Sequence, residues 1–169
     1  MQSKVKLFGH PVHQMLIVFP LGLLATAVIF DLIHLASGRP LMAVVAHWMI
    51  AAGLVGGVVA APFGLIDWLA IPAGTRAKAV GAMHGGGNVL VLLLFAGSWF
   101  LRMASPELPG TLAMALSFIG AAIASVTAWL GGELVDRLGV GVYEDAGLDA
   151  PTSLRAGKQR LRERTTAAR

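Results

Sequence analysis

Two histidines stand where the first long apolar run of the chain begins, in the segment GHPVHQML at positions 9–16. His10 and His13 are three residues apart, so a helix that starts early would place both on one face. His84 opens a later apolar run, and Asn88 follows it by one helical turn on the same face. Imidazole binds metals and haem and also changes its charge near neutral pH. These side chains are therefore the first candidates for chemistry.

Carboxylates stand at the ends of two other apolar runs. Asp67 lies near the end of the second run, and Glu133 closes the fourth, with Asp136 just beyond it. Imidazole and carboxylate ligands suit iron, zinc, copper or manganese, whereas haem b needs one or two axial imidazoles. The chain contains no cysteine, which excludes thiolate metal sites, disulfides and covalently attached haem. The expected metal ligands are His10, His13, Asp67, His84 and Glu133, and the expected haem-binding residues are His13 and His84, with His10 and Asn88 beside them.

The elements that position these residues are membrane spans. The composition is 56% hydrophobic and only 13% charged, with a mean hydropathy of +0.74, whereas soluble proteins carry about 25% charged residues. A span needs about 20 apolar residues, and four runs qualify, at about 12–35, 42–71, 79–101 and 111–132. The short connections predict antiparallel neighbours, and so an all-α, up-down four-helix bundle in the membrane. The expected domains are a four-span unit at 1–142 and a flexible basic cytoplasmic tail at 143–169.

The distribution of positive charge predicts the orientation in the membrane. All but two of the thirteen Lys and Arg residues lie in the N-terminal segment, the second connection or the tail. The exceptions are Arg39 and Arg102, so the positive-inside rule places both termini in the cytoplasm. The first run is too long for a signal-peptide core and contains Asp31, which predicts an uncleaved span. In such a protein a basic balance indicates topology, not a nucleic-acid partner.

With this topology, the residues expected to bind a cofactor lie at the cytoplasmic ends of four helices. The adjacent glycines in HGGGN (84–88) would leave room for a flat ring between helices. The sequence thus favours a haem or metal site for electron transfer, although a polar cap without a cofactor would use the same residues. Proton or solute transport is a second hypothesis, because the helices with Asp31 and Asp67 also contain Pro20 and Pro62. A structural subunit without chemistry is a third.

A second polar group falls at the opposite membrane face. Its members are Asp31, His34, His47 and Arg102. A single histidine at a membrane boundary is usually an interfacial residue bonded to backbone or lipid, so His34 and His47 alone indicate no site. The sequence assigns this group no role. Hydrolysis is not indicated either, because no GxSxG, HExxH or phosphate-binding loop is present.

Several segments together resemble a known family. GHPVHQMLIVFPLGL (9–23), AAPFGLIDWL (60–69), AMHGGGN (82–88) and WLGGELVDRLGVGV (129–142) are similar, in this order, to the predicted-membrane-protein family called domain of unknown function 2231. The chain departs from the family pattern at Gln14 and Asp136. Its motif residues fall here on His10, His13, Pro20, Asp67, His84, Asn88, Gly131, Gly132, Glu133, Gly139 and Gly141.

The resemblance implies a four-span protein of the bacterial inner membrane with no settled biochemical role. Some relatives are joined to Rieske-type iron–sulfur or cytochrome c domains, which suggests membrane electron transfer by association. This chain carries neither domain, so a redox partner would be a separate protein. A homodimer is also left open. If the protein is an enzyme, we expect a redox protein rather than a hydrolase.

Overall fold

The computed structural model describes residues 1–154 and consists mainly of long helices. A two-stranded hairpin, β1 (Lys6–Leu7) and β2 (His10–Pro11), precedes a short helix, α1 (Val12–Leu16). Four long helices follow, namely α2 (Val18–Ser37), α3 (Pro40–Leu69), α4 (Arg76–Arg102) and α5 (Thr111–Gly132). A π-helical turn, η1 (Glu133–Arg137), continues α5. The four long segments are apolar and long enough to cross a membrane, which confirms the predicted all-α fold with four spans.

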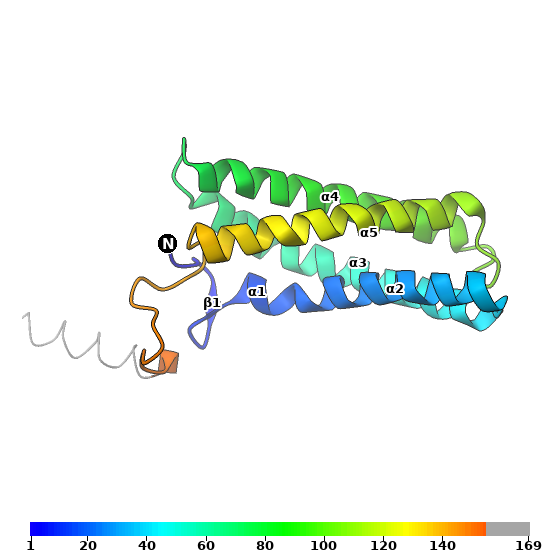
Figure 1. Ribbon diagram of the computed structural model, residues 1–169, viewed down its shortest axis with the longest axis horizontal. Coiled ribbons are helices and arrows are strands. Elements are labelled where there is room, and N and C mark those ends of the chain that lie inside the picture. The colour runs from blue at the N-terminus through cyan, green and yellow to red at the C-terminus, as the bar shows by residue number, and fades with distance from the viewer. Residues whose placement is uncertain (155–169) are drawn as a thin grey trace, which may run out of the picture.

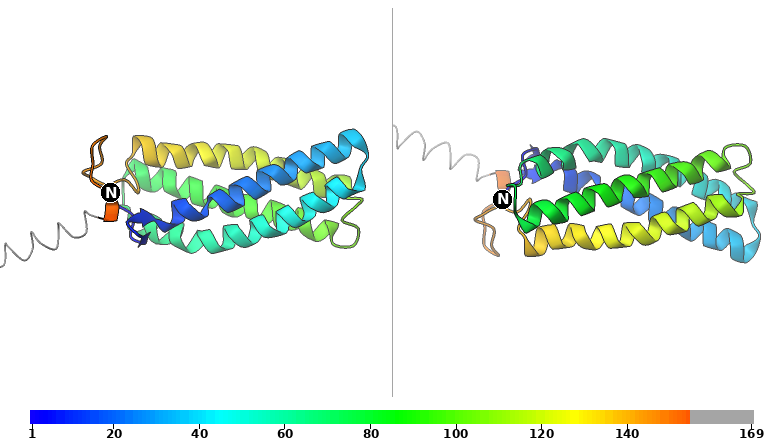
Figure 2. Two further views of the ribbon diagram at one scale, coloured as in Figure 1. Left: turned by 90° about the horizontal axis from the view of Figure 1, so that it is seen from below. Right: turned by 90° about the horizontal axis from the view of Figure 1, so that it is seen from above.

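The long helices form two hairpins that lie side by side (Figures 1 and 2). Helices α2 and α3 pack together along most of their length, and so do α4 and α5, whereas α2 and α5 touch only sparsely. One end of the bundle carries Met1, the 70–75 connection and η1, and is called the terminal end below (Figure 1). The other end carries the connections at 38–39 and 103–110, and is called the far end.

Proline accounts for a break in the first span. Pro20 has no N–H to donate to the carbonyl of Leu16, and the helix is interrupted at Ile17, between α1 and α2. Pro62 has the same deficit, yet α3 runs without interruption from Pro40 to Leu69. The break in the first span separates His13 from the long helix that follows it.

Small residues bring the helices close together. The core consists of Leu24, Ala27, Ala46, Ile50, Val91 and Phe95. Gly53 on α3 meets the side chain of Leu24, and an added Cβ would stand only 2.7 Å from it. At Gly57 an added Cβ would come within 2.5 Å of Leu92. Glycines therefore allow the interdigitation that holds α3 against α2 and α4.

The two ends of the described chain pack against each other at the terminal end. The backbone N–H of Gly141 donates to the carbonyl of Met1 at 2.8 Å, and the hydroxyl of Tyr143 donates to the carbonyl of Gly9 at 2.6 Å. Ser153 donates to the carbonyl of Phe8. The first part of the predicted tail thus contacts the N-terminal segment, and the rest of it, 155–169, lies outside the described residues.

Candidate functional site

His13 is fixed by helix α3. Its Nδ1 atom lies 3.0 Å from the carbonyl oxygen of Ala60. A carbonyl only accepts hydrogen bonds, so Nδ1 carries the proton and Nε2 carries the lone pair. The ring also lies against Gly64, where an added Cβ would stand 2.7 Å from Cε1 of His13. Helix α3 therefore sets both the tautomer and the position of this imidazole.

His84 is fixed in the same way by helix α5. Its Nδ1 atom lies 2.8 Å from the carbonyl oxygen of Thr127, which again leaves the lone pair on Nε2. The ring lies against Gly131, where an added Cβ would be 3.1 Å from Cε1 of His84. His13 lies at the start of the first span and His84 lies near the start of the third. Each imidazole is thus fixed by the neighbouring helix of its own hairpin, and in the neutral ring its lone pair is on Nε2.

Asn88 joins His84 as the spacing predicts. Its Nδ2 atom donates to the backbone carbonyl of His84 at 2.9 Å and lies 3.2 Å from Nε2 of the same residue. Its Oδ1 atom accepts a hydrogen bond from the hydroxyl of Thr127 at 2.9 Å. Thr127 is only 3% exposed, and it was not among the site residues predicted from the sequence. A threonine inside a mainly apolar span, one turn before Gly131, was the available signal.

The carboxylate of Asp67 is occupied by the N-terminal segment. It accepts hydrogen bonds from the hydroxyl of Ser3 and from the backbone N–H of Lys4, both at 2.7 Å. Asp67 lies about one turn beyond Gly64 along α3, nearer the terminal end than the ring of His13. This carboxylate therefore anchors the N-terminal segment to α3.

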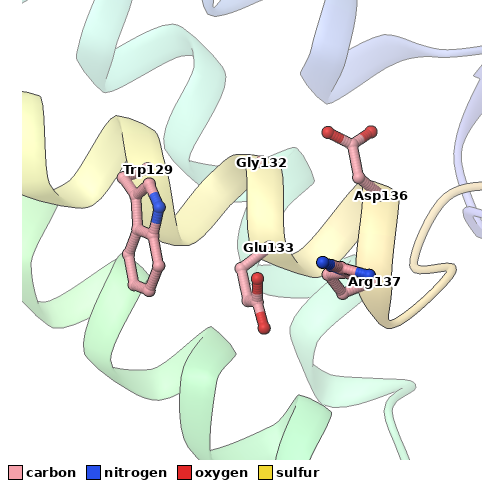
Figure 3. A pocket seen from close by; sticks show the side chains of 5 residues that line it. All are labelled: Trp129, Gly132, Glu133, Asp136 and Arg137. Carbon is pink, nitrogen blue, oxygen red and sulfur yellow. The ribbon is translucent and has the colours of Figure 1, made fainter.

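The carboxylate of Glu133 is occupied by Arg76. The two form an ion pair at 2.6 Å between the start of α4 and the start of η1. Glu133 also lines an open hollow together with Trp129, Gly132, Asp136 and Arg137 (Figure 3). In Figure 3 the side chains of Trp129 and Glu133 extend to one side of the helix and that of Asp136 to the other. Neither His13 nor His84 lines this hollow.

The predicted ligands therefore separate into distinct environments. Within residues 1–154, no three His, Asp or Glu side chains are grouped so that they could hold a metal ion. His10 is exposed on β2, where it pairs with Leu7 in the hairpin. Of the predicted set, the structure joins His84 to Asn88 and fixes His13 separately on α3. It places Asp67 and Glu133 in other contacts.

The glycines beside His84 differ in what surrounds them. Gly87 faces Thr127, whose Cγ2 atom would stand 2.5 Å from an added Cβ, so this space is already filled. Gly85 and Gly86 are exposed, and an added Cβ at either would meet no atom within 4 Å. All three glycines of HGGGN were expected to leave room for a flat ring. Open space is found at Gly85 and Gly86, whereas the side chain of Thr127 fills the space at Gly87.

The polar group at the far end contains a buried ion pair. The guanidinium of Arg102 donates to both carboxylate oxygens of Asp31 at 2.6 Å, and both side chains are 0% exposed. Ser98 and Ser117 complete the set of polar partners. His34 bonds to the carbonyl of Arg39. His47 stacks on Trp99 with ring centroids 5.6 Å apart.

The chemistry of the donor set fits a group that takes two imidazole nitrogens. Hydrogen bonds from Nδ1 to backbone carbonyls orient metal-binding histidines in this way and make Nε2 more basic. The carboxylates of Asp67 and Glu133 are held by other groups, so the histidines do not form a carboxylate-rich site with them for a hard cation.

Comparison with known proteins identifies a family but no function. A family model described as "Predicted membrane protein (DUF2231)" matches residues 9–144 of the chain. No curated protein and no solved structure matches it. The matched region contains all four spans and both histidines of the pair.

Proposed function

Because the chain belongs to the DUF2231 family of predicted membrane proteins, we propose its function from the histidine pair: the protein binds haem b through His13 and His84 and takes part in membrane electron transfer. Haem b supplies reversible one-electron chemistry when it is bound between two imidazoles. A metal ion such as iron, zinc or copper is the other group that this donor set suits.

A single observation carries this proposal. Each histidine has its Nδ1 proton committed to a backbone carbonyl of the helix beside it, that of Ala60 or of Thr127. In the neutral imidazole this leaves the lone pair of each ring on Nε2, the atom that can bind a metal or haem iron. A polar cap would not require both rings to share this tautomer.

The residues around the pair position the two rings. The carbonyls of Ala60 and Thr127 hold the rings in place and stabilise the Nδ1-protonated tautomer. Gly64 and Gly131 have no side chain, so each imidazole ring can lie close to the neighbouring helix.

The positive charges support a cytoplasmic location for the terminal end. Lys4, Lys6, Arg76, Lys78 and Arg137 all lie in segments at that end. Two arginines lie at the far end, Arg39 and Arg102. Arg102 is neutralised by Asp31, whereas Arg39 forms no ion pair within residues 1–154. This asymmetry agrees with an inner bacterial membrane and cytoplasmic termini. An electron donor or acceptor on either side would then be a separate protein.

The transport alternative finds less support in the contacts. Asp31 is paired with Arg102, and Asp67 bonds to Ser3 and Lys4. A carboxylate that carries protons or ions along a path must exchange its partners, whereas these two are held by several strong hydrogen bonds.

The visible spectrum of the purified protein tests the proposal. We expect oxidised and reduced spectra typical of haem with two imidazole ligands, after expression with haem supply or addition of haemin. His84→Ala and His13→Ala should each abolish that spectrum, whereas His34→Ala should leave it unchanged. A featureless spectrum together with no stoichiometric metal by elemental analysis would exclude the proposed cofactor site.

A further inference from the structure

The hydrogen bonds around His84 involve Asn88 and Thr127, whose hydroxyl also lies 3.0 Å from the carbonyl oxygen of Ala124. Oδ1 of Asn88 accepts from the hydroxyl of Thr127, and Nδ2 donates to the carbonyl of His84, which fixes the orientation of the amide. Nδ1 of His84 donates to the carbonyl of Thr127. Nε2 of His84 is then the acceptor of the second Nδ2 hydrogen, at 3.2 Å. Thr127 thus controls both sides of the imidazole, one directly and the other through Asn88.

The lone pair of His13 is free by comparison. Its only hydrogen bond joins Nδ1 to Ala60, and no group within residues 1–154 bonds to its Nε2. Both histidines donate Nδ1–H to a backbone carbonyl, and both rings lie against a glycine of the neighbouring helix. They differ at Nε2, which within the described residues accepts a hydrogen bond in His84 but not in His13. This difference has a direct consequence for any group that binds both nitrogens.

We infer that Asn88 competes with the bound group for Nε2 of His84, so that His13 is ligated first and His84 second, after the Asn88 amide turns away. The order of ligation rests on the proposed function, whereas the occupation of Nε2 by Asn88 does not. The hydroxyl of Thr127 holds the Asn88 amide in the competing position. Asn88 is thus a regulating residue of the site, and it need not be a ligand.

A chemical probe of the free imidazole nitrogen tests the competition without any cofactor. Diethyl pyrocarbonate acylates a neutral imidazole at an unoccupied nitrogen, and mass spectrometry measures the rate at each histidine. In the wild-type protein we expect His13 to react several-fold faster than His84. Asn88→Ala should raise the rate at His84 toward that of His13. Equal rates in the wild-type protein, or no response to Asn88→Ala, would overturn the inference.

Two further variants separate occupation of the nitrogen from access to it. Thr127→Val keeps the backbone carbonyl and the side-chain volume but removes the hydroxyl that holds Asn88, so the rate at His84 should also rise. Ser125→Ala removes a hydroxyl from the same helix that bonds only to Ala121, and should change neither rate. A rise with Asn88→Ala but not with Thr127→Val would show that added access, and not release of Nε2, is responsible.

Titration with haemin then tests the order of ligation. We expect two spectral steps in the wild-type protein, the first lost in His13→Ala and only the second lost in His84→Ala. Asn88→Ala should tighten the second step about tenfold, as expected when one hydrogen bond of about 1.4 kcal/mol no longer has to be broken. A weaker second step in Asn88→Ala would overturn the inference. If haemin does not bind but acylation follows the expected pattern, the proposed function fails and the competition by Asn88 stands.

Discussion

The carboxylate of Asp31 and the guanidinium of Arg102 form a two-pronged ion pair that joins the two helix hairpins. Asp31 belongs to α2 and Arg102 to α4, and Ser117 of α5 also bonds to both side chains. Neither charged side chain is exposed. The pair therefore connects α2 and α4, two helices that otherwise barely touch.

Removing one partner of this pair should destabilise the protein strongly. Asp31→Asn leaves a buried guanidinium without its counter-charge, and we expect the free energy of unfolding to fall by about 3–5 kcal/mol. Reversible unfolding in mixed micelles measures the change. Asp31→Leu combined with Arg102→Leu should recover most of the loss, because no charge is then left buried. A loss below 1 kcal/mol for Asp31→Asn would contradict this role.

The ion pair at the terminal end should behave differently. The side chain of Arg76 is 61% exposed and that of Glu133 is 18% exposed, so water and salt weaken their attraction. We expect Arg76→Ala to cost less than about 1 kcal/mol of unfolding free energy. The same unfolding assay at low and at high salt checks this, because the difference from wild type should shrink as salt is added. A large loss that is insensitive to salt would argue against a surface pair.

A methyl group at Gly64 should disturb His13 specifically. The Cβ of Gly64→Ala would lie 2.7 Å from the imidazole, so the ring must move away from the carbonyl of Ala60. We expect a loss of about 1–3 kcal/mol in stability and a loss of haemin binding. Gly86→Ala is the matched control, since an added Cβ there meets no atom within 4 Å. If both substitutions had equal effects, the loss would come from replacing a helical glycine and not from displacing the ring of His13.

Asp67 should control the order of the N-terminal segment. Asp67→Asn removes the charge that strengthens the hydrogen bonds from Ser3 and from the backbone of Lys4. Hydrogen–deuterium exchange over residues 3–11 should become faster, whereas exchange in α3 should not change. Asp136→Asn removes a carboxylate at the same end without altering these bonds and serves as the control. Unchanged exchange over residues 3–11 in Asp67→Asn would contradict the anchoring role.

Hydropathy alone was enough to predict the four spans, because crossing a membrane demands long apolar helices with short connections. The break near Pro20 was also predictable from the missing N–H, and the contact of His84 with Asn88 from their spacing. These features depend on residues within one helix, where geometry is set by the backbone.

Partners on different helices were harder to predict, because they depend on how each helix is rotated about its axis. Asp31 and Arg102 were assigned to one membrane face, but no spacing rule relates positions 71 residues apart. Asp67 was predicted to face the histidines, and it instead bonds to the N-terminal segment, which folds back over the end of α3. Thr127 was not predicted, because its carbonyl and hydroxyl bond to His84 and Asn88 of another helix.

The ion pair between the hairpins also bears on how the protein is made. Asp31 enters the membrane with the first hairpin, and Arg102 is synthesised 71 residues later, at the end of the third span. The first hairpin therefore carries a carboxyl group with no positive partner until the second hairpin has been inserted. Packing of the second hairpin against the first thus brings Arg102 to Asp31 inside the bundle after both have been synthesised.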